Sequence, residues 1–178
     1  MNVVSFFYGM SCGQLALQRA GFEIENYYAY EIDKYAMQVT QKNFPNTKQM
    51  GSVTEAKGID LLKCDLFIGG SPCQGFSFAG KQLNFEDPRS KLFFEYVRML
   101  KELREINPEI KFLLENVKMK KEYQDVISFY LGCEPIEINS KLLSAQKRSR
   151  LYWTNIDNIS IPADKEILLK DVMLDSDD

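Results

Sequence analysis

The stretch that decides the fold is "NVVSFFYGMSCGQLALQRAG", residues 2–21. Its first part is a run of mostly apolar residues that is typical of a buried strand, and "CGQLALQRAG" has the spacing of a short helix that ends at Gly21. Gly9 and Gly13 lie in and beside the turn that joins them. A strand, a glycine-containing turn and a helix in this order form the first half of a βαβ unit.

The same alternation continues along the chain. Strands are expected at residues 23–31, 65–69 and 111–117, helices at 33–44, 91–107 and 122–132, and a closing pair of strands at 134–143 and 150–156. This pattern predicts an α/β fold with a mostly parallel sheet, helices on both faces and a terminal antiparallel strand pair. Because the chain has 178 residues, of which 45% are hydrophobic, one domain is the simplest organisation.

The composition excludes several classes of function. The chain has no histidine, and its four cysteines show no CxxC spacing, so neither the usual zinc site nor Ser-His-Asp or Cys-His catalysis can be assembled, and we expect no metal. No apolar run approaches the ~20 residues of a membrane span, and the N-terminus lacks a basic start, so we expect a cytoplasmic protein without a membrane partner.

The charge argues against a stand-alone nucleic-acid binder, because the net charge is -3. Two local basic clusters remain, "KMKKE" at residues 118–122 and "QKRSR" at residues 146–150. Each is either a solvated face or part of a binding surface.

Four residues of reactive or small type come at or just after the end of an expected strand: Gly9, Glu31, Cys73 and Glu115. In a parallel sheet, ligands bind beyond the carboxyl ends of the strands, near the point where the strand order reverses. The sequence therefore predicts that these residues gather at one rim of the sheet.

The rim has the features of a nucleoside site. Glu31 follows the glycine turn by about 20 residues, a distance at which a carboxylate accepts hydrogen bonds from ribose hydroxyls. The glycine spacing is GxxxG instead of GxGxxG, which favours an adenosine-type ligand without phosphates over NAD. A purely structural turn is the competing interpretation.

The chemistry of the rim is carried by three segments. Cys73 follows a Gly-Gly-Ser-Pro turn and is the one conventional strong nucleophile there, although a cysteine beside glycines is, judged alone, more often inert. Glu115 could share a proton with a ring nitrogen or form a surface salt bridge. Arg148 and Arg150 alternate along an extended segment, so they are expected to point the same way and could hold a phosphate or a carbonyl oxygen.

These motifs together resemble those of the DNA cytosine-5 methyltransferases. "FYGMSCG" is similar to the first cofactor motif of that family, "SPCQGFS" to its catalytic Pro-Cys loop, "ENV" to its Glu-Asn-Val motif and "QKRSR" to its Gln-x-Arg-x-Arg motif, in the order of the family. The resemblance covers residues 3–155. It implies the Rossmann-like fold of S-adenosylmethionine-dependent methyltransferases and transfer of a methyl group to C5 of a cytosine that is flipped out of double-stranded DNA.

The resemblance also implies roles for individual residues. Cys73 would attack C6 of the cytosine, Glu115 would protonate or hydrogen-bond N3, and Arg150 would hold O2. Pro72 would offer its carbonyl to the exocyclic amine, Arg148 would organise the pocket or meet a phosphate, and Asn116 would brace the loop. S-adenosylmethionine, and its product S-adenosylhomocysteine, would bind at Phe7, Gly9, Gly13, Glu31, Ile32, Ser52, Val53, Pro72 and Leu92.

Three departures from the family pattern stand out. Gly51, Ser52 and Val53 replace the usual Gly-Asp-Ile or Gly-Asp-Val, so a carboxylate expected near the adenine amine is missing, and Tyr8 replaces a small or acidic residue. The last two family motifs have no counterpart. We therefore expect a catalytic domain at residues 1–160 and a polar, acidic extension at 161–178, which leads toward a target-recognition region supplied by a missing half or a second subunit.

Two alternatives stay open. One is an accessory homologue that binds a methyltransferase without catalysing, against which the joint presence of Cys73, Glu115, Arg148 and Arg150 argues. The other is an RNA cytosine-5 methyltransferase, which uses the same chemistry and the same motifs.

Overall fold

The computed structural model describes residues 1–61, 63–72 and 88–173. The strands are β1 (Asn2–Phe6), β2 (Asn26–Tyr30), β3 (Lys48–Gln49), β4 (Leu66–Gly69), β5 (Lys111–Val117), β6 (Ile136–Asn139) and β7 (Ser149–Thr154). The α-helices are α1 (Cys12–Arg19), α2 (Lys34–Asn43), α3 (Pro88–Ile106) and α4 (Lys121–Leu131). Short 3-10 helices include η1 (Val53–Glu55) and η2 (Gly58–Leu61).

The strands form a seven-stranded sheet in the order β3-β2-β1-β4-β5-β7-β6. Pairing is parallel from β3 to β5, whereas β7 runs antiparallel to both β5 and β6. The predicted mostly parallel sheet with a terminal antiparallel strand pair is therefore confirmed. The strand order reverses between β1 and β4. Open sheets of this kind bind their ligands beyond the carboxyl ends of the strands at such a point, which is the predicted rim.

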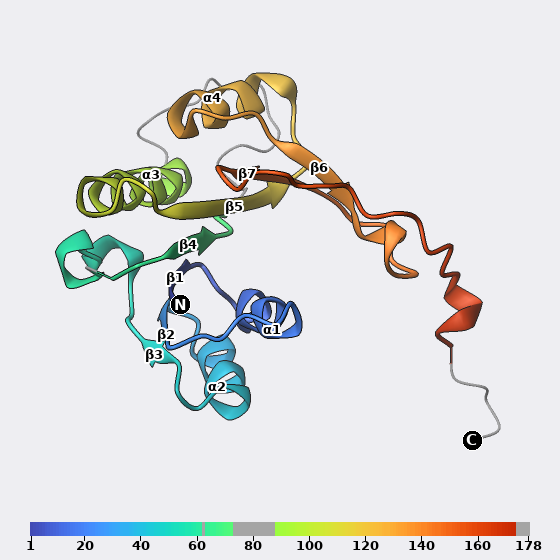
Figure 1. Cartoon of the computed structure of the whole chain (residues 1–178), viewed down its shortest axis with the longest axis horizontal. Coiled ribbons are helices and arrows are strands. Elements are labelled where there is room, and N and C mark those ends of the chain that lie inside the picture. Colours follow the sequence, from blue (N-terminus) through green and yellow to red (C-terminus); the bar gives the residue numbers. More distant parts are fainter. Residues whose placement is uncertain (62, 73–87, 174–178) are drawn as a thin grey trace.

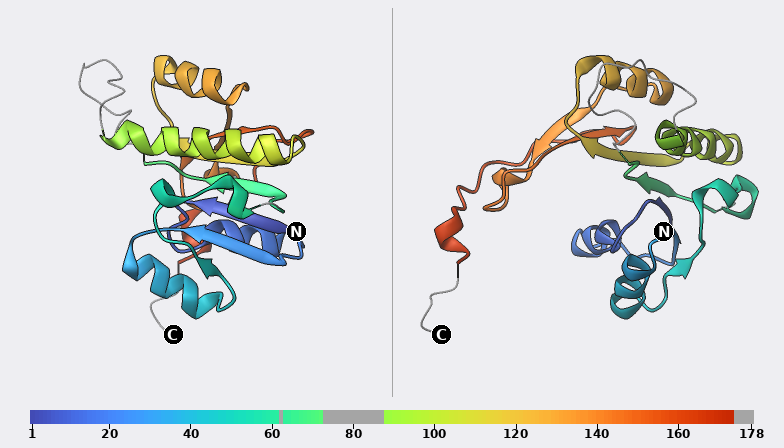
Figure 2. Two further views of the ribbon diagram at one scale, coloured as in Figure 1. Left: turned by 90° about the vertical axis from the view of Figure 1, so that its left-hand side faces the viewer. Right: turned by 180° about the vertical axis from the view of Figure 1, so that it is seen from behind.

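Helices lie on both faces of the sheet (Figure 1). The main hydrophobic cluster lies between the sheet and α3, α4, η1 and η2, and a smaller cluster lies on the opposite face, where α1 and α2 pack. Both views of Figure 2 show the same layers. Because alternate residues of a strand point to opposite faces, Val4 and Phe67 enter the main cluster while Val3 and Leu66 enter the smaller one.

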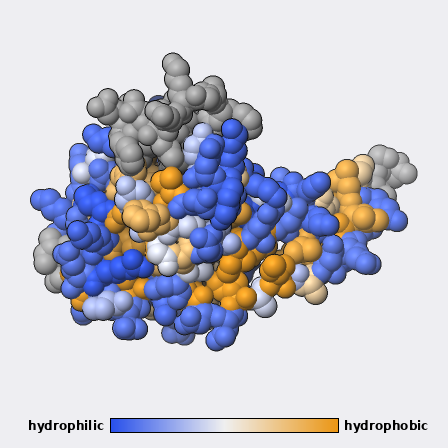
Figure 3. All heavy atoms as spheres, turned by 90° about the horizontal axis from the view of Figure 1, so that it is seen from above, coloured by the Kyte–Doolittle hydropathy of each residue, from blue (hydrophilic) through white to orange (hydrophobic). Residues whose placement is uncertain are grey.

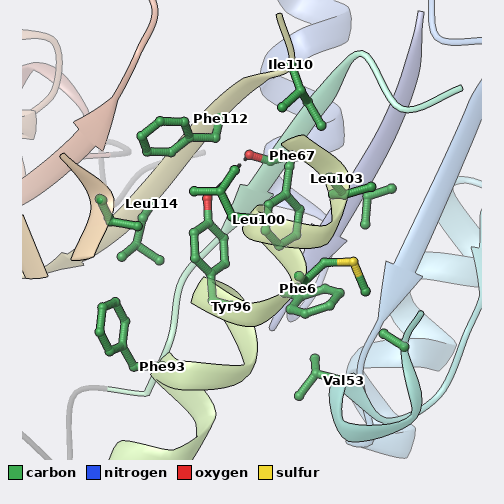
Figure 4. Packing of buried hydrophobic residues seen from close by; sticks show 14 of the residues in the cluster. Phe6, Val53, Phe67, Phe93, Tyr96, Leu100, Leu103, Ile110, Phe112 and Leu114 are labelled. Atoms are coloured by element: carbon green, nitrogen blue, oxygen red, sulfur yellow. Dashed lines mark hydrogen bonds between the residues drawn. The ribbon is translucent and has the colours of Figure 1, made fainter. Parts of the chain in front are cut away.

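Aromatic packing fixes α3 against the centre of the sheet (Figure 4). The ring of Tyr96 stacks on Phe67 at a centroid distance of 4.3 Å, and its hydroxyl donates to the Phe67 carbonyl at 3.5 Å. Phe6 meets Phe67 edge to face at 4.9 Å. At the other end of the sheet, the buried Trp153 of β7 donates its Nε1–H to Ser128 Oγ of α4 at 3.0 Å.

Local signals explain where α2 begins and where α4 ends. Asp33 caps α2, because its Oδ1 accepts hydrogen bonds from Tyr35 N at 2.8 Å and Ala36 N at 3.0 Å. Gly132 ends α4 in the left-handed conformation, with φ 75°, and its N–H donates to the Ser128 carbonyl at 2.8 Å.

Three features differ from the expectation. β3 is an edge strand of two residues that the sequence pattern does not reveal, and β6 is shorter than expected because Ser140–Leu142 form a 3-10 turn. β7 ends at Thr154 instead of at residue 156, and residues 155–173 extend away from the sheet beside β6 and β7 (Figure 1). This extension carries exposed apolar side chains beside its charged ones (Figure 3), namely Ile156, Ile159, Ile161, Leu168, Leu169, Val172 and Met173.

Candidate active site at the carboxyl rim of the sheet

The turn after β1 has an unusual backbone. Phe7, Gly9 and Ser11 all have positive φ angles, of 57°, 56° and 63°. This conformation is easy for glycine but strained for Phe7 and Ser11, and such strain is concentrated at functional sites. The turn aims the Gly9 N–H at the Glu31 carboxylate, which accepts it at 3.0 Å. Two of the predicted rim residues are therefore in direct contact.

Glu31 is held by three backbone N–H groups. Its Oε2 accepts from Gly9, and its Oε1 accepts from Ile32 at 2.9 Å and from Asp33 at 3.1 Å. A carboxylate has about four acceptor positions, so one position on Oε2 remains for a further donor. The side chain is thus oriented before any ligand binds.

The other residues predicted for the cofactor differ in their exposure and in what they pack against. Ile32 is 78% exposed, an unusual state for an isoleucine at the end of a strand. Gly13 lies where a Cβ atom would come within 2.7 Å of Ile68 Cδ1, so it lets α1 approach β4 closely. Leu92 is partly buried against the main core, and Val53 is buried within it.

Ser52 caps η1, with its Oγ accepting from Thr54 N at 3.3 Å. Its hydroxyl also forms a hydrogen bond with that of Thr54, at 2.8 Å. Tyr8, the other departure from the family pattern, packs its ring into the smaller core cluster. Its hydroxyl donates to Gln49 Oε1, and burial raises the pKa of the phenol.

Glu115 forms an ion pair with Arg150 across the β5–β7 ladder. Arg150 Nε lies 2.8 Å from Glu115 Oε1, with 18% of the Arg150 side chain and 35% of the Glu115 side chain exposed. The antiparallel register brings them together, since Val117 faces Arg150 and Glu115 faces Tyr152. Burial, and secondarily the charge of Glu115, raise the pKa of Tyr152. Two of the residues predicted to contact the base therefore share one half-buried location.

Asn116 ties the start of the Pro-Cys segment to β5. It is 2% exposed, and its Nδ2 donates to Ser71 O at 3.2 Å and to Ser71 Oγ at 3.3 Å. Ser71 directly precedes Pro72, which is the last described residue of this segment. The predicted nucleophile Cys73 lies outside the described residues.

Arg148 is not brought to the ion pair. It lies exposed just before β7, and its backbone N–H donates to Asn139 Oδ1 at 3.0 Å. The charges of Arg148 and Arg150 both act on the phenol of Tyr152, so the two arginines share this neighbour, and whether their side chains point the same way stays a prediction.

The lysines of "KMKKE" pair with nearby carboxylates. Lys118 lies 3.0 Å from Glu137, Lys120 lies 3.7 Å from Glu122, and Lys121 contacts both Asp125 and Glu134. These pairs favour the interpretation of this cluster as a solvated face.

Sequence reasoning missed two residues at this rim. Gly70 and Ser71 belong to the quoted Pro-Cys turn, but their contacts with Glu115 and Asn116 depend on the pairing of β4 with β5 and cannot be read from spacing. Within the described ranges, histidine, cysteine and carboxylate side chains form no group of three or more that could hold a metal ion. Among the same residues, no helix combines the length and the hydropathy that a membrane span requires.

Comparison with known proteins identifies relatives across nearly the whole chain. Type II methyltransferase M.HhaI of Haemophilus parahaemolyticus is 32% identical, with 98% of this chain and 57% of the relative covered. Type II methyltransferase M.FnuDI of Fusobacterium nucleatum is 36% identical, with 91% and 50% covered. The chain spans about half the length of the curated relatives that it matches.

Solved structures share the fold. The Entamoeba histolytica methyltransferase EhMeth superimposes with a TM-score of 0.75 at 22% identity, covering 94% of this chain and 57% of that one. A Spodoptera frugiperda DNMT2 mutant gives a TM-score of 0.66 at 24% identity, with 94% and 54% covered. The family model for C-5 cytosine-specific DNA methylase matches residues 1–126. On this match and these relatives, the chain belongs to the C-5 cytosine-specific DNA methylases.

Proposed function

We propose that this chain is the catalytic part of a DNA cytosine-5 methyltransferase, which transfers a methyl group from S-adenosylmethionine to C5 of a flipped-out cytosine. The observation that carries the proposal is the Glu115–Arg150 ion pair, which lies beside the end of β4 that leads into Pro72 and Cys73. Family membership supplies the reaction class. Target flipping is required because C6 is shielded within the base stack.

Each of three residues has its own role in the proposed reaction. The Cys73 thiolate forms a bond to C6, and the electron pair displaced from the C5–C6 bond makes C5 nucleophilic. Glu115 donates a hydrogen bond or proton to N3 and so draws charge from the ring, while Arg150 holds O2. After methylation, water or hydroxide removes the C5 proton because the chain has no histidine, and the bond between C6 and the Cys73 sulfur then breaks.

The rim fits the cofactor that the family implies. S-adenosylmethionine, when bound, supplies an electrophilic methyl group. The free acceptor position of Glu31 suits one ribose hydroxyl, and the exposed Ile32 side chain suits the adenine face. Phe7, Gly9 and Gly13 would shape the methionine end, with Ser52, Val53, Pro72 and Leu92 around the remainder. The buried Ser11 Oγ has no hydrogen-bond partner within the described structure, which marks this turn as incompletely satisfied.

We further propose that residues 1–160 form the catalytic domain and that residues 161–178 lead toward a target-recognition part carried by a further polypeptide, covalent or separate. Double-stranded DNA would be the substrate. Two facts support this division: the chain spans about half the length of its relatives, and apolar side chains at 161–173 are exposed. Asn116 would brace the Pro-Cys loop, and Arg148 would meet a phosphate.

The test is covalent trapping. Fluorine at C5 of 5-fluorocytosine cannot be lost as a proton is, so the covalent intermediate accumulates. The wild-type chain should therefore form a protein–DNA adduct when S-adenosylmethionine and the downstream polypeptide, meaning the one that carries the target-recognition part, are supplied. Cys73→Ala should form none. An adduct that persists in Cys73→Ala would assign the nucleophile to another residue. An RNA substrate tested in parallel separates the two cytosine methyltransferase alternatives.

A further inference from the structure

Gly70 lies where a side chain would press on Glu115. A Cβ atom built on Gly70 would come within 3.3 Å of Glu115 Oε2, which is closer than ordinary van der Waals contact for such a pair. The other carboxylate oxygen, Oε1, lies 2.8 Å from Arg150 Nε. One oxygen of the Glu115 carboxylate thus lies close to Gly70, and the other contacts the guanidinium of Arg150.

The backbone at Gly70 is anchored on both sides. The Gly70 N–H donates to the Phe6 carbonyl of β1 at 3.3 Å. The next residue, Ser71, is 4% exposed and accepts two hydrogen bonds from the buried Asn116. The backbone of Gly70 and of Ser71 cannot shift without losing these hydrogen bonds. A side chain added at Gly70 would therefore move the flexible side chain of Glu115 instead.

We propose that Gly70 is a positioning residue for the methyl-transfer reaction: by having no side chain, it sets where the Glu115 carboxylate lies relative to Arg150 and Pro72. The proposal rests on the function proposed above. Because Glu115 is 35% exposed and can shift outward, a residue larger than glycine should be tolerated by the fold and still harm the reaction. This separation of stability from activity distinguishes positioning from a merely structural role.

The first experiment needs no activity. In the wild-type chain, the ¹⁵Nε–¹Hε resonance of Arg150, assigned by its loss in Arg150→Lys, reports the bond to Glu115. Gly70→Ala should shift this resonance toward its position in Glu115→Ala. The control for a general steric disturbance is Gly58→Ala, in η2, which packs against α3. Its Cβ would meet Glu102 Cβ at 2.8 Å, a tighter contact than the one at Gly70, and it should leave the Arg150 resonance unchanged. An unchanged Arg150 resonance in Gly70→Ala would overturn the proposed arrangement.

The second experiment measures the reaction, with the downstream polypeptide supplied. Gly70→Ala should slow single-turnover methyl transfer by about 3- to 10-fold, because the Glu115 carboxylate has to move by a few tenths of an ångström and a 1 Å misplacement costs about 100-fold, while the affinity for S-adenosylhomocysteine stays unchanged. In a Glu115→Gln background, Gly70→Ala should lower the rate of methyl transfer by less than a further factor of about two, because both substitutions act on the same side chain.

Multiplicative losses in the double variant would refute positioning through Glu115. If the wild-type chain itself transferred no methyl group and formed no adduct, the proposed function would fail and the catalytic purpose of Gly70 would fail with it. The Arg150 resonance would separate that outcome from an error in the local geometry.

Discussion

Removal of the Glu31 carboxylate should weaken cofactor binding by a predictable amount. Three of its four acceptor positions are already used by Gly9, Ile32 and Asp33, so one charge-assisted hydrogen bond to a ribose hydroxyl is at stake. Such a bond contributes about 1.5–3 kcal/mol, which corresponds to a rise of about 10- to 150-fold in the Kd of S-adenosylhomocysteine. Glu31→Ala also frees the Gly9 N–H, so the turn loses part of its support.

The assay is isothermal titration calorimetry at neutral pH with the demethylated product, which is not consumed. Asp33→Ala is the matched control, because Asp33 is a neighbouring carboxylate that caps α2 through Tyr35 N and Ala36 N. Losing this cap costs about 1 kcal/mol of stability and should leave the Kd within about twofold. Equal Kd values for Glu31→Ala and the wild type, or equal weakening by both variants, would refute the ribose assignment.

Further predictions concern stability and pH, and each is read by urea unfolding. Trp153→Phe should lower the free energy of unfolding by about 1–2 kcal/mol, because the buried Ser128 hydroxyl loses its donor; an unchanged midpoint would exclude this bond as a contributor. Gly132→Ala should cost about 1 kcal/mol, because its φ of 75° is strained for alanine, whereas an equal or higher midpoint would contradict the capping role. Burial raises the pKa of Cys64 from 9.0 to about 12, so the unfolded thiol ionises first and stability should fall as pH rises from 9 to 12. In Cys64→Ala, the free energy of unfolding should fall less steeply over that pH range. Parallel curves for the variant and the wild type would show that the Cys64 thiol is not the group responsible.

The sequence alone determined the alternation of strands and helices, the placement of Glu31 just after β2 and that of Glu115 near the end of β5. This was possible because apolar periodicity encodes the type of element, and because parallel strands present their carboxyl ends at one edge. The glycine turn after β1 could also be located, because it lies between a strand pattern and a helix pattern. The two-residue β3 could not, since an edge strand of that length has no periodicity of its own.

The tertiary structure decided which rim residues meet. Insertion of β7 between β5 and β6 brings Arg150 to Glu115, although many residues separate them in the chain, and leaves Arg148 exposed nearby. The pairing of β4 with β5 places Gly70 against the same carboxylate. Local sequence cannot specify such contacts, because they depend on strand order and register, which are set by the packing of the whole sheet against its helices.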